Sequence, residues 1–314
     1  MRVTAWTFAK EPYKREVVRQ SEPHINGDKN HESQVSVTEA MWNAWDLIVN
    51  LRGLGWNWPR GLRIPSQTCH TDSVPIFLVL SLVRLAFYTV AFDVTSGAVR
   101  SFSPETFGPA AGGTIFDPSL PPVARYLRAS LISFLSAWTA YFVIEMVYQI
   151  HAIEFTLLFR QRPSQWPPLF DAPWMATSIA NFWGRRWHQL FRDCFVAVGS
   201  RPLKRYLGRV GGVMGAFFVS GILHDLGLRG MGRGGDSLVV IGFFLMNGVG
   251  LALEYAWKKG TGKYVGGFGG WLWMMTWMLM WGNLMVDAWA RRGLVGSEFF
   301  PEAYRPTTLL LAWF

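Results

Sequence analysis

Two histidines in this sequence occupy positions where an imidazole could act as a base. His224 and Asp225 lie near the end of an apolar block that begins at Gly208. An ionisable residue within a membrane helix is costly and is therefore a functional candidate by default. A desolvated histidine stays neutral, as a general base must. The alternative is a structural histidine at a helix end that makes one interhelical hydrogen bond.

The second histidine, His188, lies in the stretch Asn181-Phe-Trp-Gly-Arg-Arg-Trp-His-Gln189. The two adjacent arginines could bind phosphate groups through charge-assisted hydrogen bonds, and the histidine could polarise a carbonyl or orient a hydroxyl. The alternative is an interfacial amphipathic helix with Trp and Arg at headgroup level. The candidate binding residues around His188 are Asn181, Trp183, Arg185, Arg186, Trp187 and Gln189.

Together these residues fit one reaction. A hydroxyl that attacks a thioester needs a base, a group that stabilises the oxyanion, and a surface for the phosphates of coenzyme A. His224, His188 and the pair Arg185 and Arg186 could supply all three. No motif for a seryl or cysteinyl nucleophile occurs, so direct transfer without a covalent enzyme intermediate is the simpler scheme.

Other residue pairs indicate less. His151 and Glu154 form an H-x-x-E pair without a second copy, and we interpret it as a hydrogen-bonded interfacial pair. The only cysteines, Cys69 and Cys194, have no zinc or disulfide spacing. We therefore predict no metal site and no bound cofactor. The glycine-rich run 230–235 is interpreted as a turn between two helices because it lacks a strand-turn-helix context.

Composition indicates an integral membrane protein. Charged residues make up 16% of the 314 residues and hydrophobic residues 50%, with 17 Trp and 23 Phe. A typical soluble domain has about 25% charged residues. The net charge is +9, but the Lys and Arg residues lie in short loops between apolar blocks. This pattern argues against a nucleic-acid partner and favours the headgroups of a lipid bilayer.

The apolar blocks predict an all-α, multispanning helical bundle. Residues 1–72 are expected to form a polar, irregular leader without a signal peptide, whose Gly- and Trp-rich piece 52–59 suits a membrane interface. Residues 73–314 form the transmembrane domain. We count about five spans, each near the roughly 20 residues that cross a bilayer. The blocks are 74–92, 129–159, 208–227, 237–257 and 264–288, with a loop over 96–122.

Residues 160–208 form a basic connection that we place on the cytoplasmic side. Within it, the apolar spacing over 181–198 predicts one amphipathic helix along the membrane surface. No internal repeat is found.

The segments 181–189 and Ser220-Gly-Ile-Leu-His224 together resemble the wax synthase domain of fungi and plants, a group similar to the membrane-bound O-acyltransferase superfamily. Arg52-Gly-Leu-Gly-Trp56 resembles an upstream segment of the fungal members, and the resemblance covers about residues 45–290. The superfamily's invariant histidine maps onto His224. A second polar position, Asn in many members, maps onto His188. Family members usually carry further helices before Arg52, where this chain has the polar leader.

The resemblance implies acyl-CoA-dependent O-acylation in the endoplasmic reticulum membrane. The short, Gly- and Trp-rich form looks more like the fungal acetyltransferases, so we expect acetyl-CoA as donor and a hydrophobic alcohol, a hydroxylated terpenoid or meroterpenoid, as acceptor. A long-chain-alcohol acyltransferase is the nearest alternative. Rivals of other classes are a solute transporter, a membrane terpene cyclase that uses Asp225, Asp193 or Glu145 as acid, and a truncated inactive paralogue.

Overall fold

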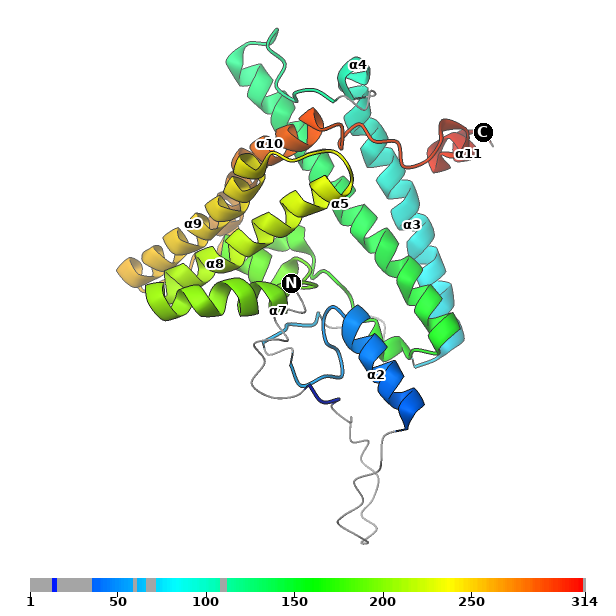
Figure 1. The fold of residues 1–314 in the computed structure, drawn as a ribbon. Coiled ribbons are helices and arrows are strands. Elements are labelled where there is room, and N and C mark those ends of the chain that lie inside the picture. The colour runs from blue at the N-terminus through cyan, green and yellow to red at the C-terminus, as the bar shows by residue number, and fades with distance from the viewer. Residues whose placement is uncertain (1–12, 16–35, 59–60, 66–71, 108–111, 313–314) are drawn as a thin grey trace.

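The computed structural model describes residues 13–15, 36–58, 61–65, 72–107 and 112–312. These residues form helices joined by turns and loops, and the only β-bridge among them joins Arg15 to Trp56. Figure 1 shows the long helices in two groups, one on each side of the molecule. The all-α prediction is confirmed for the described residues.

The first pair of helices, α3 (Val74–Ser101) and α5 (Pro122–Phe159), lies side by side along most of its length (Figure 1). Both helices have proline in the first turn, where its missing N–H costs nothing. Each is longer than its apolar block, because polar residues at the membrane boundary continue the helix. The connection between the two helices is therefore shorter than the loop predicted over 96–122. The short helix α4 (Pro104–Phe107) lies within this connection.

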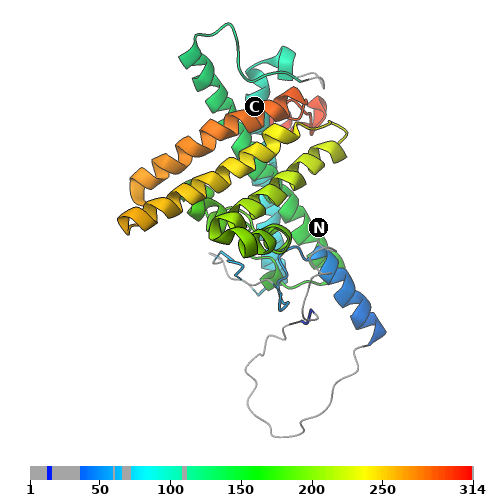
Figure 2. The same cartoon turned by 60° about the vertical axis from the view of Figure 1, so that its left-hand side comes forward.

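The second layer contains α8 (Arg201–Gly230), α9 (Ser237–Thr261) and α10 (Gly267–Arg291), which run side by side in Figure 2. Gly208 interrupts α8 with a φ of 64°, a conformation that glycine adopts without strain. At Gly221 a Cβ atom would lie 2.8 Å from the Cα of Ile241 on α9. Glycine there lets the two helices approach closely.

Four helical segments are long and apolar enough to cross a membrane. These are Val74–Ser101, Pro122–Phe159, Arg192–Gly230 and Ser237–Thr261. The fifth expected block does form a helix, α10, which carries five Trp and four Gly residues and is not among these four segments. The multispanning architecture is confirmed, with four candidate spans where the sequence indicated about five.

The N-terminal leader is more ordered than predicted over its described part. Residues 37–49 form helix α2 (Val37–Val49), and the Ser36 hydroxyl caps it by accepting a hydrogen bond from the Glu39 N–H. In the Gly- and Trp-rich piece, Trp56 and Trp58 are buried within the protein. The Trp56 indole donates to the Asp46 carboxylate at 2.7 Å, because a buried indole N–H needs an acceptor.

The predicted surface helix over 181–198 is also wrong, because the segment breaks into several pieces. Helix α6 (Ile179–Asn181) runs into a π-helical turn, η3 (Phe182–Arg186), which stops at Trp187 in extended conformation. The chain then turns and re-enters helix at α7 (Arg192–Cys194) and a second π-helical turn, η4 (Phe195–Ser200), which continues into α8. Single π-helical turns are frequent at functional sites.

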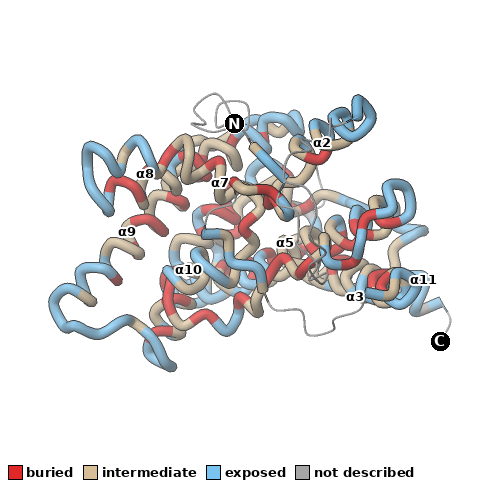
Figure 3. Tube along the Cα trace, turned by 90° about the horizontal axis from the view of Figure 1, so that it is seen from below, coloured by how far each residue is buried: buried red, intermediate tan, exposed pale blue. Residues whose placement is uncertain are grey.

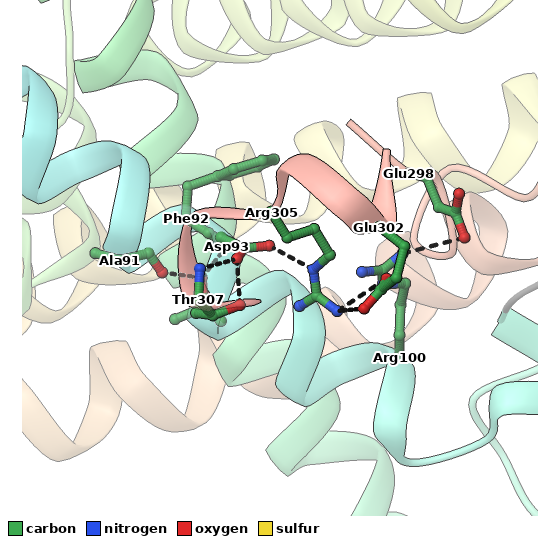
Figure 4. A network of polar contacts seen from close by, with 9 residues as sticks. Ala91, Phe92, Asp93, Arg100, Glu298, Glu302, Arg305 and Thr307 are labelled. Atoms are coloured by element: carbon green, nitrogen blue, oxygen red, sulfur yellow. Dashed lines mark hydrogen bonds and ion pairs between the residues drawn. The ribbon is translucent and has the colours of Figure 1, made fainter. Parts of the chain in front are cut away.

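The inward sides of the helices carry most buried residues, as Figure 3 shows, while the far ends of α8 and α9 are exposed. Near the C-terminus, η5 (Glu302–Tyr304) and α11 (Pro306–Leu311) pack back onto α3. The buried Asp93 carboxylate accepts hydrogen bonds from the Arg305 guanidinium at 2.9 Å and the Thr307 backbone N–H at 3.0 Å (Figure 4). This contact anchors the C-terminal segment.

Candidate active site

His224 lies on α8 with its ring held on two sides. Its Nδ1 is 2.8 Å from the Ser220 backbone carbonyl, one turn earlier on the same helix. A carbonyl can only accept, so Nδ1 carries the proton and Nε2 of the neutral ring keeps its lone pair. The ring of Phe244 on α9 lies 4.3 Å away, centroid to centroid, at 34°. The arrangement leaves Nε2 as the nitrogen that can accept a proton.

Asp225, the neighbour of His224, is occupied by structural contacts. Its carboxylate accepts hydrogen bonds from the Arg229 guanidinium at 2.9 Å and from the Ser237 hydroxyl at 2.7 Å. Ser237 is the first residue of α9, so these contacts tie the end of α8 to the start of α9. An ionised carboxylate held in this way is a poor proton donor, which weakens the terpene cyclase alternative for this residue.

His188 follows the end of the π-helical turn η3. Its ring packs against Trp187 at 5.4 Å and Phe170 at 5.5 Å, centroid to centroid. Part of the ring is accessible, but Nδ1 is buried and has no hydrogen-bond partner among the described residues. Burial, with the nearby positive charges of a protonated His224 and of Arg52, lowers the pKa of His188 to about 3. The imidazole is therefore neutral at physiological pH.

A continuous set of ring contacts connects the two histidines, from His188 through Trp187, Trp183 and Phe244 to His224. Trp183 is the link in this set. Its indole is 6.0 Å from Trp187, which touches His188, and 6.1 Å from Phe244, which touches His224. Its Nε1 donates to the Asn247 side chain at 3.0 Å. The site is therefore enclosed mainly by aromatic rings.

Arg185 and Arg186 differ in how much of the guanidinium a ligand could use. Arg186 donates to the Asp171 and Ala172 carbonyls at 2.7 and 3.2 Å and to the Asn181 side chain at 2.8 Å. It therefore holds the 171–172 loop against η3. Arg185 is half exposed and makes one ion pair with Asp171, at 3.1 Å. Of the two, Arg185 has more donor capacity left for a phosphate.

The other two predicted binding residues mainly support the backbone. The Asn181 carbonyl oxygen accepts from Arg186 and more weakly from the Thr177 N–H, at 3.4 Å. Gln189 is buried, and its amide donates to the Gly184 carbonyl at 2.8 Å and accepts from the Arg63 N–H at 3.3 Å. Both side chains stabilise the turn that presents His188.

Arg52 is a residue of this neighbourhood that sequence reasoning missed. The guanidinium is buried and donates to the carbonyls of Pro167 and Pro168 and to the Tyr148 hydroxyl, at 2.8, 3.0 and 2.6 Å. It therefore anchors the segment that carries Phe170. Arg52 also lines a small cleft beside the site, together with Leu51, Trp58, Leu62, Gln189, Arg192 and Asp193. Its place in the Arg-Gly-Leu-Gly-Trp motif was the available signal.

Two buried polar residues of α9 were also missed. Glu254 accepts hydrogen bonds from the Ile179 and Ala180 N–H groups at 2.6 and 3.0 Å, and so caps the start of α6. Asn247 is fully buried, donates to the Phe243 carbonyl at 2.9 Å and holds Trp183. Neither residue stands in a recognisable motif, so only the structure reveals its role.

The remaining candidates lie apart from the site or outside the described residues. His151 and Glu154 are exposed and 3.2 Å apart, which confirms the predicted hydrogen-bonded pair. Cys194 is buried, and Cys69 lies outside the described residues. Among the described residues, no group of three or more His, Cys, Asp or Glu side chains could hold a metal ion.

Comparison with known proteins agrees with the resemblance drawn from the sequence. Residues 166–246, which include both histidines, match the profile of the membrane bound O-acyl transferase family. The chain is 26% identical to acetyltransferase ple2 of Rhodocybe pseudopiperita over 218 residues, 66% of this chain and 54% of that protein. It is 36% identical to a long-chain-alcohol O-fatty-acyltransferase of Simmondsia chinensis over 100 residues, 29% of this chain and 28% of that protein.

A third relative, acyl-CoA–sterol O-acyltransferase 1 of Arabidopsis thaliana, is 26% identical over 237 residues, 70% of this chain and 64% of that protein. The chain thus spans less than two thirds of the length of each of these three relatives. The similarity to wax-synthase-like acyltransferases is confirmed, and the residues that match the family profile include both histidines.

Proposed function

We propose that this chain, similar over 166–246 to membrane bound O-acyl transferases, transfers an acyl group from a CoA thioester to an alcohol within the membrane. The observation that carries the proposal is the enclosure of His188 and His224 by one set of aromatic rings, with Nε2 of His224 available as a base. We assign the endoplasmic reticulum as the compartment, by analogy with the family.

The transfer is written as one displacement. His224 Nε2 takes the proton of the acceptor hydroxyl while the hydroxyl oxygen bonds to the thioester carbonyl carbon. His188, a neutral imidazole, positions the carbonyl or the alcohol through its single N–H. The carbon–sulfur bond then breaks, and the departing thiolate receives the proton held by His224. The products are an ester and free coenzyme A, and no covalent enzyme intermediate is needed.

We assign the binding residues by the hydrogen-bond donors and ring surfaces that their contacts within the protein leave free. Arg185 is exposed enough to meet the CoA phosphates, whereas Arg186 holds the loop on which the site rests. Trp183 and Trp187, whose rings are 6.0 Å apart, would wall the site of the acceptor. Such walls fit an apolar acceptor, and they exclude water that would otherwise hydrolyse the thioester.

Acetyl-CoA is the donor that we propose, with a hydroxylated terpenoid or meroterpenoid as acceptor. Support comes from the similarity to acetyltransferase ple2, which aligns with two thirds of this chain. A long-chain-alcohol O-fatty-acyltransferase is the second candidate, because a relative of that name is 36% identical over 100 residues.

The test is donor and acceptor profiling with microsomes that contain the full chain. Radiolabelled acetyl-CoA and palmitoyl-CoA are each offered with sterol, terpenoid and long-chain alcohols, and labelled ester is measured. We expect ester from acetyl-CoA with a terpenoid alcohol. Palmitoyl ester of a long-chain alcohol would favour the second candidate, and solute flux or acyl-CoA-independent conversion of a polyprenyl substrate would favour a different class.

His224→Ala tests the mechanism in the same assay. Loss of a general base lowers turnover by about 100- to 10,000-fold. The matched control is His151→Ala, because His151 is exposed on α5 and paired only with Glu154. We expect the control to keep wild-type turnover at equal membrane expression. Near-normal transfer by the His224 variant would disprove the assigned base.

A further inference from the structure

One end of the α8–α9 helix pair carries seven cations, which we call the basic end. They are Arg201, Lys204, Arg205 and Arg209 from the start of α8, and Lys258, Lys259 and Lys263 from the end of α9 and the turn after it. The sequence has no Asp or Glu between Asp193 and Asp225 or between Glu254 and Asp287. No described carboxylate forms an ion pair with any of the seven.

The two groups of cations belong to one surface. The Arg209 guanidinium lies 4.7 Å from the centroid of the Tyr255 ring, which joins the start of α8 to the end of α9. The Lys258 ammonium lies over the Tyr264 ring at 3.8 Å and donates to its hydroxyl. Figure 1 shows these two helix ends next to each other, and Figure 3 shows that they are largely exposed.

Large apolar and aromatic side chains stand among these cations. Tyr206 and Tyr264 are 79% and 76% exposed, and the others in the same stretches are Leu207, Trp257 and Phe268. Rings with a polar edge and long basic side chains are the usual anchors at headgroup level. A soluble polyanion would satisfy the charges but not the apolar surface. A phospholipid satisfies both.

The opposite end of the same helices has no such surface. There Arg229 pairs with Asp225 and Arg291 with Asp287, at 2.9 and 2.7 Å. Arg233 and Arg292 donate to backbone carbonyls of the neighbouring turns, in each case at about 3 Å. The arginines at that end have partners within the protein. The two ends therefore differ in the number of cations and in how many of those cations a ligand could still bind.

We propose that the basic end binds the headgroups of anionic phospholipids. By the bias of Lys and Arg toward the cytoplasmic side, the leaflet it contacts is the cytoplasmic one. Anionic lipids of that leaflet attract each nearby basic residue by about 1 kcal/mol, or roughly fivefold in affinity. The inference does not depend on acyl transfer, since the basic end lies on a different part of α8 and α9 from His224 and Phe244.

The test uses the purified full chain in phosphatidylcholine liposomes with nitroxide-labelled phosphatidylserine or phosphatidylcholine. Electron paramagnetic resonance gives the ratio of the two association constants. We expect a clear preference for phosphatidylserine that weakens at 0.5 M salt, because exposed charges are screened. Lys259→Gln/Lys263→Gln should lower that ratio at least threefold. Equal association of both lipids with the unaltered chain would overturn the proposal.

The matched control is Arg160→Gln/Arg162→Gln, which removes two exposed cations at the end of α5. The control should leave the ratio unchanged, and an equal loss would mean that total charge, not the basic end, selects the lipid. A phosphate of coenzyme A is the other source of the same chemistry. If the lysine variant raised the KM for acetyl-CoA in pure phosphatidylcholine while the lipid preference persisted, the surface would serve the donor and the proposal would fail.

Discussion

Arg52 offers the sharpest test of how the site is built, through the variant Arg52→Met. The substitution keeps the length of the side chain and removes all donors. Three hydrogen bonds are lost, to the Pro167 and Pro168 carbonyls and to the Tyr148 hydroxyl. The Tyr148 hydroxyl also donates to the Pro167 carbonyl at 2.6 Å, so those two groups keep each other as partners. Only the Pro168 carbonyl loses its described donor.

The expected loss of stability follows from that count. An orphaned buried acceptor costs about 1–3 kcal/mol, and removal of the buried charge offsets part of the loss, so we expect a net cost of about 2 kcal/mol. The effect on turnover should be larger. Phe170 follows Pro168 closely and packs against His188, and a 1 Å displacement of a positioning group can cost about 100-fold.

The assay compares thermal unfolding and acetyl transfer for the purified protein in nanodiscs. Arg185→Met is the matched control, because Arg185 is half exposed and its single ion pair should contribute about 1 kcal/mol or less. We expect the control to unfold near the wild-type midpoint. The reasoning would be refuted if Arg52→Met kept both the midpoint and the turnover of the wild type, or if the midpoint of the control fell as far as that of Arg52→Met.

Three further perturbations address other parts of the site. Asn247→Leu removes the acceptor of the Trp183 N–H, so the midpoint should fall by the equivalent of about 1–2 kcal/mol and turnover should fall with it, whereas Leu253→Ala on the exposed face of α9 should change neither. Because the pKa of His188 is about 3 when folded and near 6.5 when unfolded, the unfolded chain binds the extra proton. Stability should therefore drop by up to about 1.4 kcal/mol per pH unit below pH 6.5, a slope that His188→Asn should flatten in denaturation at stepped pH. Gly221→Ala places a Cβ 2.8 Å from the Ile241 backbone, so it should lower the midpoint by the equivalent of about 1–3 kcal/mol, while Gly227→Ala, which meets open space, should not.

The spans could be predicted from sequence because bilayer thickness sets a length that apolar blocks must meet. Val74 and Ser237 lie at the start of two predicted blocks, and the observed helices α3 and α9 begin at these two residues. The ends were less predictable, since polar residues continue α3 to Ser101. Periodicity also failed over 181–198, where the Arg186 carbonyl accepts a hydrogen bond from the Asp171 N–H instead of extending the helix. Such a contact depends on a loop that lies outside the segment 181–198, so the apolar spacing within the segment cannot predict it.

The burial of the upstream motif was missed for a related reason. Gly, Trp and Arg are common at membrane interfaces, so composition alone favours an interfacial position for residues 52–58. The observed packing depends on long-range partners. Arg52 bonds to the segment at 167–168, and Trp56 bonds to Asp46 on α2. The candidate site residues could be predicted from residue types and their spacing in the sequence. The contacts that surround them are seen only in the fold. Their catalytic and binding roles remain predictions.

The contacts around the two histidines also bear on which class of chemistry the site can perform. Two carboxylates of this region make structural contacts: Asp225 with Arg229 and Ser237, and Glu254 with two backbone N–H groups and the Trp273 indole. A cyclase needs a carboxylic acid that can give up a proton, and a proton path needs polar groups that exchange partners. Nδ1 of His188 has no described hydrogen-bond partner, and Nε2 of the neutral His224 ring keeps its lone pair. A neutral imidazole beside aromatic rings suits the removal of a proton from a hydroxyl, which is the step that direct acyl transfer requires.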